Sequence, residues 1–313
     1  MTITFGSMLN QMAGLFAMLI VGYCMNRLRL LPEATEAVLS KISAKIFLPC
    51  LMAYTFMEQC TVENLMTYSN LILYGGLFQL ISMAVAVLLA KPLGKGDTFL
   101  TGVYRYALSF PNLGGFGYPT ILALFGQLGL FQYQLYMLLN QVLCYVWGVG
   151  QMMPAEDKGG WKGVMKKLFN PVVLGIITGA VLGLTEIAQW IPSGLRTTVN
   201  TLGSCFTPIS LILAGSVIAN YKILDILKEK RTYIVSALRL ILIPGAFLLV
   251  LRALHLPDML CIMTCLGFAC PCGVNTVVYP AAYGQDTRPG AGLTLMTSTL
   301  AVITIPILMA IIL

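Results

Sequence analysis

The chain has 313 residues, of which 58% are hydrophobic and only 10% are charged, and its formal net charge is +7. Its mean hydropathy is +0.84. A soluble protein carries about 25% charged residues, so this composition indicates an integral membrane protein and leaves almost no residues for a soluble domain. We expect residues 1–5 to begin the first membrane helix, because they lack the basic segment and cleavage site of a signal peptide.

Apolar segments of about 20 residues are long enough to cross a bilayer as helices. The chain holds ten such segments, which predicts an all-α membrane protein with ten transmembrane helices. The sixth segment has the shortest apolar core, but it follows Asn170-Pro171, a typical helix start. The expected spans are residues 5–25, 35–57, 68–90, 98–125, 130–150, 167–190, 193–220, 232–254, 257–283 and 290–313.

Ten spans place the connecting loops alternately on the two sides of the membrane. Lysine and arginine are unevenly divided between these two sides. The side reached after spans one, three, five, seven and nine holds most of them, and the opposite side holds only Arg196 and Arg252. The positive-inside rule then places both termini outside a multi-pass protein of the cell (inner or plasma) membrane. This topology accounts for the net charge without a nucleic-acid partner. The cytoplasmic set is Arg27, Arg29, Lys91, Lys95, Lys158, Lys162, Lys166, Lys167, Lys222, Lys228, Lys230, Arg231 and Arg288.

The two halves of the chain match span by span. Tyr118-Pro119 in the fourth span corresponds to Tyr279-Pro280 in the ninth, and Pro49 in the second span corresponds to Pro208 in the seventh. Because five is odd, the second copy enters the membrane upside down, which makes an inverted repeat. We therefore expect residues 1–150 to form the first five-helix repeat, residues 151–169 a cytoplasmic linker, and residues 170–313 the second, inverted repeat.

Helix-breaking residues interrupt the fourth and ninth spans near their middles. Residues 111–119 read Pro-Asn-Leu-Gly-Gly-Phe-Gly-Tyr-Pro, and residues 271–280 read Pro-Cys-Gly-Val-Asn-Thr-Val-Val-Tyr-Pro. Proline and glycine free backbone groups from helical hydrogen bonds, and in lipid those groups must be satisfied by protein or by a water-filled cavity. Paired broken helices indicate the midplane binding site of a secondary transporter.

The breaks predict an anion site without charged side chains. We expect one half-helix to begin near Tyr118 and the other near Tyr279, with both N-termini at the membrane centre. Helix N-termini present free N–H groups and partial positive charge, which favour anions. Alternatively, the breaks are packing kinks in which asparagines satisfy loose carbonyls. The predicted substrate-binding residues are Asn112, Gly114, Gly115, Tyr118, Gly273, Asn275 and Thr276.

Other polar residues within the spans support or extend this site. No aspartate or glutamate lies deep in a span, which argues against a carboxylate-based proton antiporter and against a cationic substrate. Lys45, Arg105 and Arg239 each lie about 10–12 Å from the cytoplasmic end of a span. They either snorkel to the interface or line a vestibule for anions, for which Lys45 is the best candidate. Asn140 and Gln141 either line the cavity or join helices.

The chain shows no pattern of an enzyme or metalloprotein. Its nine cysteines lack nearby histidine or carboxylate partners. No zinc-protease helix and no paired membrane aspartates occur. We therefore expect no cofactor, no metal and no enzymatic activity.

An ordered set of short motifs resembles the auxin efflux carrier family, whose bacterial members are described as malate or malonate permeases. The resemblance implies a fold similar to that of sodium/proton antiporters and bile-acid sodium symporters. Spans 1, 2, 6 and 7 would then form a scaffold, spans 3–5 and 8–10 a moving core with two crossed broken helices, and a substrate carboxylate would dock at Asn112. The motifs are Val21-Gly22-Tyr23, Leu39-Ser40-Lys41 through Leu48-Pro49, Phe110-Pro111-Asn112 through Gly126, Asn170-Pro171, Pro208, Tyr279 through Gly284, and Thr297-Ser298-Thr299-Leu300.

Together these observations predict a secondary transporter of small organic anions, mono- or dicarboxylates, that works by alternating access. One alternative is a sodium-coupled symporter of the bile-acid type, with a cation site made of carbonyl, threonine and asparagine oxygens. Another is a non-transporting receptor or a channel-like protein. The expected partners are the anion and the lipid bilayer, with a homodimer as a further option.

Overall fold

The computed structural model is helical in most of its described residues, which are 5–32, 34–153, 170–220 and 229–312, and these residues form no strand. This confirms the all-α class. Within these residues, six helices are long and apolar enough to cross a membrane, and three apolar helices are shorter. Residues 154–169 of the expected linker lie outside the described residues. The six long helices are Thr35–Gln59, Val62–Gly94, Leu113–Tyr136, Ser193–Ala219, Lys230–Ala253 and Arg288–Ile312, and the shorter ones are Ala13–Arg27, Pro171–Leu184 and Asp258–Ala269.

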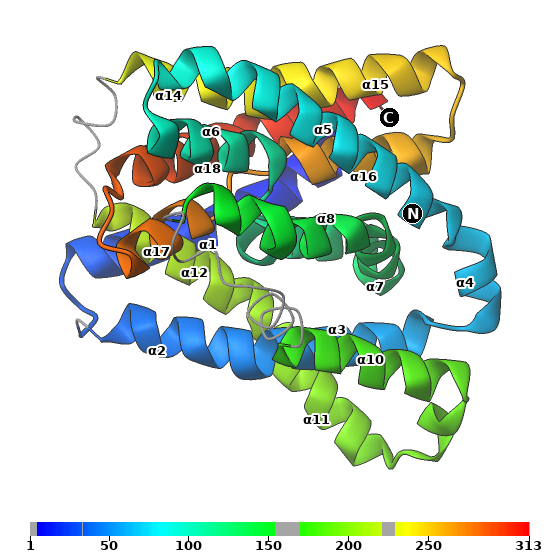
Figure 1. Ribbon diagram of the computed structural model, residues 1–313. Coiled ribbons are helices and arrows are strands. Elements are labelled where there is room, and N and C mark those ends of the chain that lie inside the picture. The colour runs from blue at the N-terminus through cyan, green and yellow to red at the C-terminus, as the bar shows by residue number, and fades with distance from the viewer. Residues whose placement is uncertain (1–4, 33, 154–169, 221–228, 313) are drawn as a thin grey trace.

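Helices follow one another along the chain with short connections (Figure 1). The first half contains α1 (Phe5–Arg27), α2 (Thr35–Ile42), η1 (Ser43–Phe47), α3 (Leu48–Gln59), α4 (Val62–Tyr68), α5 (Asn70–Gly94), α6 (Thr98–Ser109), η2 (Leu113–Gly117), α7 (Tyr118–Tyr136), α8 (Leu138–Leu143), η3 (Cys144–Gly148) and η4 (Val149–Gln151). The second half contains α10 (Pro171–Leu184), η6 (Ile187–Trp190), α11 (Ser193–Ser204), α12 (Phe206–Ala219), α14 (Lys230–Ala237), η7 (Leu238–Leu242), α15 (Ile243–Ala253), α16 (Asp258–Ala269), α17 (Asn275–Ala282) and α18 (Arg288–Ile312).

Local sequence explains where several helices begin and bend. The Asn170 side chain accepts hydrogen bonds from the N–H groups of Val172 (2.9 Å) and Val173 (3.1 Å), so the predicted start of α10 is confirmed. Asp97 caps α6 through the N–H of Leu100 (2.9 Å). Gly126, with φ of 66°, divides α7 into two helices of different direction, at the predicted end of the fourth span.

Three of the five-residue π-turns precede a proline. The turns η1, η2 and η7 end two residues before Pro49, Pro119 and Pro244. A proline lacks an N–H, and its ring collides with the carbonyl one turn earlier in an α-helix. A π-turn holds one extra residue, which gives the ring room and lets the helix continue. These prolines therefore widen their helices without ending them.

The helices fall into two groups. The α3 group consists of α1, α2, α3, α10, α11 and α12, in which α1 packs on α12 and α3 packs on α10 and α11. The α5 group consists of α5 to α8 and α14 to α18, in which α5 packs on α6, α15 on α16, and α16 and α14 on α18. In Figure 1 the helices α2, α3, α10 and α11 follow one edge of the molecule, and α5, α14 and α15 follow the opposite edge.

Glycines allow the closest helix crossings within the α3 group. Every fourth residue of α10, from Gly175 to Gly183, faces α3, and an added Cβ there would collide with a carbonyl group of α3. Gly215 of α12 makes the same kind of approach to Leu19 of α1. Small residues at such crossings let helix backbones pack directly in a membrane. The α3 group is therefore a closely packed unit.

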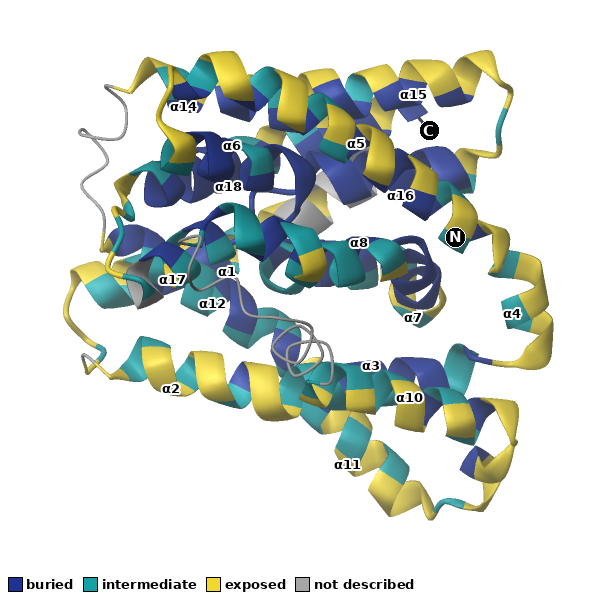
Figure 2. Ribbon diagram, viewed as in Figure 1, coloured by how far each residue is buried: buried dark blue, intermediate teal, exposed yellow. Residues whose placement is uncertain are grey.

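Burial differs between the inner and outer helices (Figure 2). Residues 260–269 of α16 are all buried, whereas much of α10 and α11 is exposed. The exposed side chains include large apolar ones, such as Leu73 at 76% and Leu249 at 72%. An apolar outer surface is what a bilayer requires of helices that face lipid.

Candidate functional site

Two non-helical segments meet inside the molecule. Residues 110–112 separate α6 from η2, and residues 270–274 separate α16 from α17; we call them the break segments. They lie antiparallel, bridged between Pro111 and Cys272, and the backbone N–H of Asn112 donates to the carbonyl oxygen of Pro271 (2.8 Å). Segments from opposite halves of the chain therefore lie side by side.

One of the two helices that follow the break segments begins where the sequence predicts. The helix α7 begins at Tyr118, directly after the π-turn that starts at Leu113, whereas the predicted start near Tyr279 is wrong, because α17 begins at Asn275. In the first case, Asn112 caps a π-turn that precedes the Tyr-Pro pair. In the second, Tyr-Pro lies inside α17. The prolines that seemed to close each break are thus inside the new helices.

Three of the carbonyls that the breaks free accept hydrogen bonds from long side chains. Arg239 donates from Nη1 to the carbonyl oxygen of Leu108 (2.8 Å) and from Nε to that of Cys270 (3.1 Å). Gln79 donates from Nε2 to the carbonyl oxygen of Ser109 (3.4 Å). The alternative in which asparagines satisfy these loose carbonyls is therefore wrong for these three groups.

The structure places the three basic residues of the spans in different surroundings. Arg239 is 0% exposed, so its interpretation as a snorkelling side chain is wrong. Arg105 is half-buried and donates from Nη1 to Gln151 (3.1 Å). Lys45 is exposed in η1 and does not line the cavity described below. Arg239 lies deepest because its hydrogen-bond acceptors are backbone carbonyls inside the molecule.

The side-chain amide of Asn112 is fixed at its oxygen by a hydrogen bond. Its Oδ1 accepts from the N–H of Gly115 (2.9 Å), and its carbonyl oxygen accepts from the N–H groups of Phe116 (3.1 Å) and Gly117 (3.0 Å). Because Oδ1 must face the donating N–H, the amide nitrogen Nδ2 points away from it, and the described residues offer Nδ2 no acceptor. A Cβ on Gly115 would lie 2.7 Å from Nδ2, so Gly115 acts by leaving room for Asn112.

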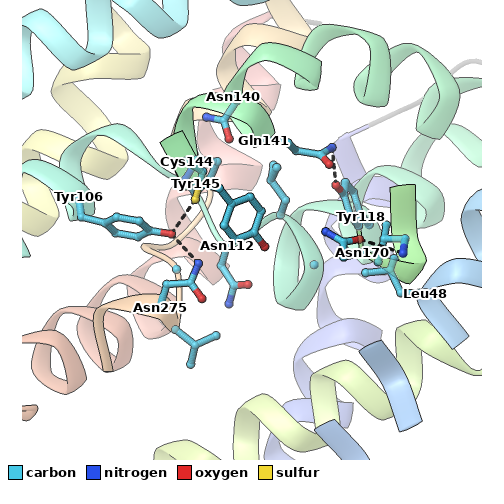
Figure 3. Close-up of a pocket in the computed structure, with 16 residues that line it drawn as sticks. Leu48, Tyr106, Asn112, Tyr118, Asn140, Gln141, Cys144, Tyr145, Asn170 and Asn275 are labelled. Atoms are coloured by element: carbon cyan, nitrogen blue, oxygen red, sulfur yellow. Dashed lines mark hydrogen bonds between the residues drawn. The ribbon is translucent and has the colours of Figure 1, made fainter. Parts of the chain in front are cut away.

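Asn275 is held by a side chain from the other broken span. Its Nδ2 donates to the hydroxyl of Tyr106 (2.8 Å), which also shares a hydrogen bond with Cys144 Sγ (3.1 Å), as Figure 3 shows. A tyrosine hydroxyl can donate as well as accept. The Asn275 amide can therefore present either its oxygen or its nitrogen to a neighbouring ligand.

A cavity of about 220 Å³ lies beside both helix starts (Figure 3). It lies between the two helix groups, because Leu48 and Val172 come from the α3 group and most other residues come from the α5 group. Its described lining residues include amides and hydroxyls, and none of them is a carboxylate or a basic side chain. The lining residues are Leu48, Tyr106, Pro111, Asn112, Leu113, Gly114, Tyr118, Asn140, Gln141, Cys144, Tyr145, Asn170, Val172, Gly273, Val274 and Asn275.

Four backbone N–H groups at the helix starts have no hydrogen-bond acceptor among the described residues. They belong to Leu113, Gly114, Val274 and Asn275. All four residues line the cavity. Free N–H groups at helix N-termini carry partial positive charge. The cavity is thus bordered by hydrogen-bond donors and by the positive ends of two helices.

Seven of the ten predicted site residues lie at this cavity. They are Asn112, Gly114, Tyr118, Asn140, Gln141, Gly273 and Asn275. Gly115 and Thr276 do not line it, nor does Lys45. Thr276 is 0% exposed and donates to the carbonyl oxygen of Gly273 (2.9 Å), facing α18. Sequence reasoning missed Tyr106, Cys144 and Asn170, although Tyr106 lies one turn before the first break.

Asn140 and Gln141 both line the cavity and join helices. Asn140 Nδ2 donates to Oε1 of Gln79 (2.5 Å). Gln141 Nε2 donates to the Tyr118 hydroxyl (3.0 Å) and to Oε1 of Gln134 (2.6 Å). The two interpretations left open for these residues are compatible. The described part of the chain holds no group of three or more histidine, cysteine, aspartate or glutamate side chains that could hold a metal ion.

Apolar helices around a polar internal cavity define a multi-pass membrane protein. The family model described as membrane transport protein matches residues 7–162 and 160–309 of the chain. The chain therefore belongs to this family, the auxin efflux carrier family, and the resemblance seen in the sequence is confirmed. No curated protein matches the chain. The protein is thus a membrane transporter.

Proposed function

We propose that the protein is a secondary transporter of small organic anions, mono- or dicarboxylates, which bind in the cavity between the two helix starts. The observation that carries this proposal is the set of donors there: four free backbone N–H groups and the Asn112 amide nitrogen. A carboxylate accepts several such hydrogen bonds and is favoured by helix dipoles. A cation would find no carboxylate among the described residues that line the cavity.

The proposed architecture is ten transmembrane helices in two inverted five-helix repeats. In such a repeat, span one corresponds to span six, and span two corresponds to span seven. The packing of span one on span seven must then correspond to the packing of span six on span two. These are the α1–α12 and α3–α10 pairings. The α5–α6 and α15–α16 pairings correspond in the same way. This pairwise agreement supports the repeat, since unrelated halves need not share it.

Transport in this proposal requires the α5 group to move against the α3 group. The cavity lies between them, so a shift of the α5 group would carry Asn112 and Asn275 toward one membrane face or the other. Polar contacts join the groups in the present state: Thr55 of α3 donates to Oε1 of Gln127 in α7 (2.6 Å). Such contacts must break in each cycle.

A ligand screen on the purified protein tests the substrate class. Small mono- and dicarboxylates are expected to raise the unfolding temperature, because a ligand that binds only the folded state stabilises it by mass action. The amides of the same acids have the same shape without the charge and are expected to have little effect. Equal stabilisation by acid and amide would show that the cavity does not select anions.

Labelling of single cysteines tests the proposed orientation in the cell membrane, with both termini outside. Trp190, 87% exposed, and His255 belong to connections proposed to lie outside. Lys91 and Arg288 lie on the proposed cytoplasmic side. In a cysteine-free background, an impermeant thiol reagent should label cysteine at 190 or 255 in intact cells, and at 91 or 288 only after lysis. The reverse pattern would invert the topology.

A further inference from the structure

Arg239 is a charged side chain that the proposed binding site does not use. It is 0% exposed, and its guanidinium joins the carbonyl oxygens of Leu108 and Cys270. Leu108 lies in the last turn of α6, and Cys270 directly follows α16. The C-terminal end of a helix carries partial negative charge. One guanidinium thus bonds the negative ends of both interrupted helices, while the positive ends of the following helices border the cavity.

The charge of Arg239 has no acidic partner among the described residues. No ion pair in the described part of the chain includes it, and its Nη2 has no hydrogen-bond partner. Two helix ends of about half a negative charge each are comparable to the charge of Arg239, so the guanidinium neutralises them and leaves the positive ends of the following helices to set the potential at the cavity, in an interior where charges act over longer distances. Such a potential favours an anion in the neighbouring cavity, although Arg239 does not line it.

Arg239 also occupies two backbone oxygens of the kind that a coupling cation would use. In transporters with broken helices, unwound carbonyls and helix C-terminal ends coordinate sodium. Here Arg239 takes two of these carbonyls, and Gln79 takes that of Ser109. Four other break carbonyls accept hydrogen bonds from described residues: those of Asn112, Pro271, Gly273 and Val274.

We propose that Arg239 is the resident cation of the break segments: it positions both helix ends and replaces a coupling sodium ion, so that anion transport needs no sodium gradient. This inference rests on the proposed function and decides against its sodium-coupled alternative. Arg239 is a positioning residue, since it acts through the helix ends and not by touching the substrate.

Two matched variants separate charge from hydrogen bonding. Arg239→Lys keeps a charged donor, whereas Arg239→Gln keeps a donor without charge. The lysine variant is expected to transport with a KM within a few-fold of wild type. The glutamine variant is expected to show a KM raised about tenfold or more, the scale of losing one charge-assisted interaction. If the lysine variant folds and the glutamine variant does not, that result also supports the need for a positive charge at this position. Equal defects in the two variants would overturn the proposal.

Cation replacement tests the second half of the proposal. Uptake by the wild-type protein in proteoliposomes is expected to be unchanged when choline replaces sodium, and a strict sodium requirement would overturn the proposal. If the protein carries no organic anion at all, the proposed function fails, yet Arg239 can still be tested. The unfolding temperature is then expected to be the same in sodium chloride and choline chloride, and a sodium-specific rise would show a bound sodium ion.

Discussion

Replacing Asn112 with aspartate is expected to abolish transport while the protein still folds. The carboxylate can still accept from the N–H of Gly115, and a negative charge is favourable at a helix N-terminus. The lost amide nitrogen is the part that faces no protein acceptor, and the new oxygen repels an anion. Loss of one donor to a charged ligand costs about 1.5–3 kcal/mol, or roughly 10- to 150-fold in affinity, and the added charge increases this effect.

Asn112→Ala is the matched comparison, because it removes both the cap and the donor. It is expected to lose transport and also to lower the unfolding temperature, since a lost N-cap costs about 1 kcal/mol. Uptake per folded molecule and the unfolding temperature should be measured for both variants. A well-folded Asn112→Asp protein that transports organic anions at the wild-type rate would contradict the site.

Joining α3 to α7 covalently is expected to stop transport completely. Thr55 and Gln127 are hydrogen-bonded between the two helix groups, so cysteines at both positions can be bridged by Hg(II) or a short bifunctional thiol reagent. If the α5 group must move past the α3 group, the bridge holds the carrier in one state. Uptake should be measured in a background without native cysteines, before cross-linking, after it, and after reversal of the Hg(II) bridge with excess thiol.

A second cysteine pair within one group provides the control. Asn26 of α1 and Asn220, which follows α12, share a hydrogen bond (3.1 Å), and both lie in or beside the α3 group. Bridging them is expected to leave transport intact, because the α3 group moves as one unit. If the 55–127 bridge leaves transport intact as well, relative movement of the two groups is not the mechanism.

Features set by neighbouring residues could be predicted from the sequence. The start of α10 follows from Asn170-Pro171, and both breaks follow from proline and glycine in apolar spans. The π-turn that starts at Leu113 and lets Pro119 lie inside a helix was not predicted, and neither was the start of α17 at Asn275, which leaves Pro280 inside that helix. A short motif does not reveal whether a proline ends a helix or widens it.

Features set by residues far apart in sequence could not be predicted. Arg239 bonds carbonyls of Leu108 and Cys270, which no local pattern brings together. Thr276 was expected at the site because it lies in the motif, but it faces α18, where Gly290 lets the backbones approach closely. The position of a break along the chain does not tell which side chains turn toward the cavity.

Counterflow in proteoliposomes tests the central claim most directly. Vesicles containing the purified protein are loaded with an unlabelled small carboxylate, and uptake of the same acid, labelled and at trace concentration, is followed without a sodium gradient. An alternating-access carrier of organic anions is expected to accumulate the label transiently above equilibrium, and Asn112→Asp should not. Label that only equilibrates without an overshoot would indicate a channel, and no uptake of any small carboxylate would contradict the proposed function.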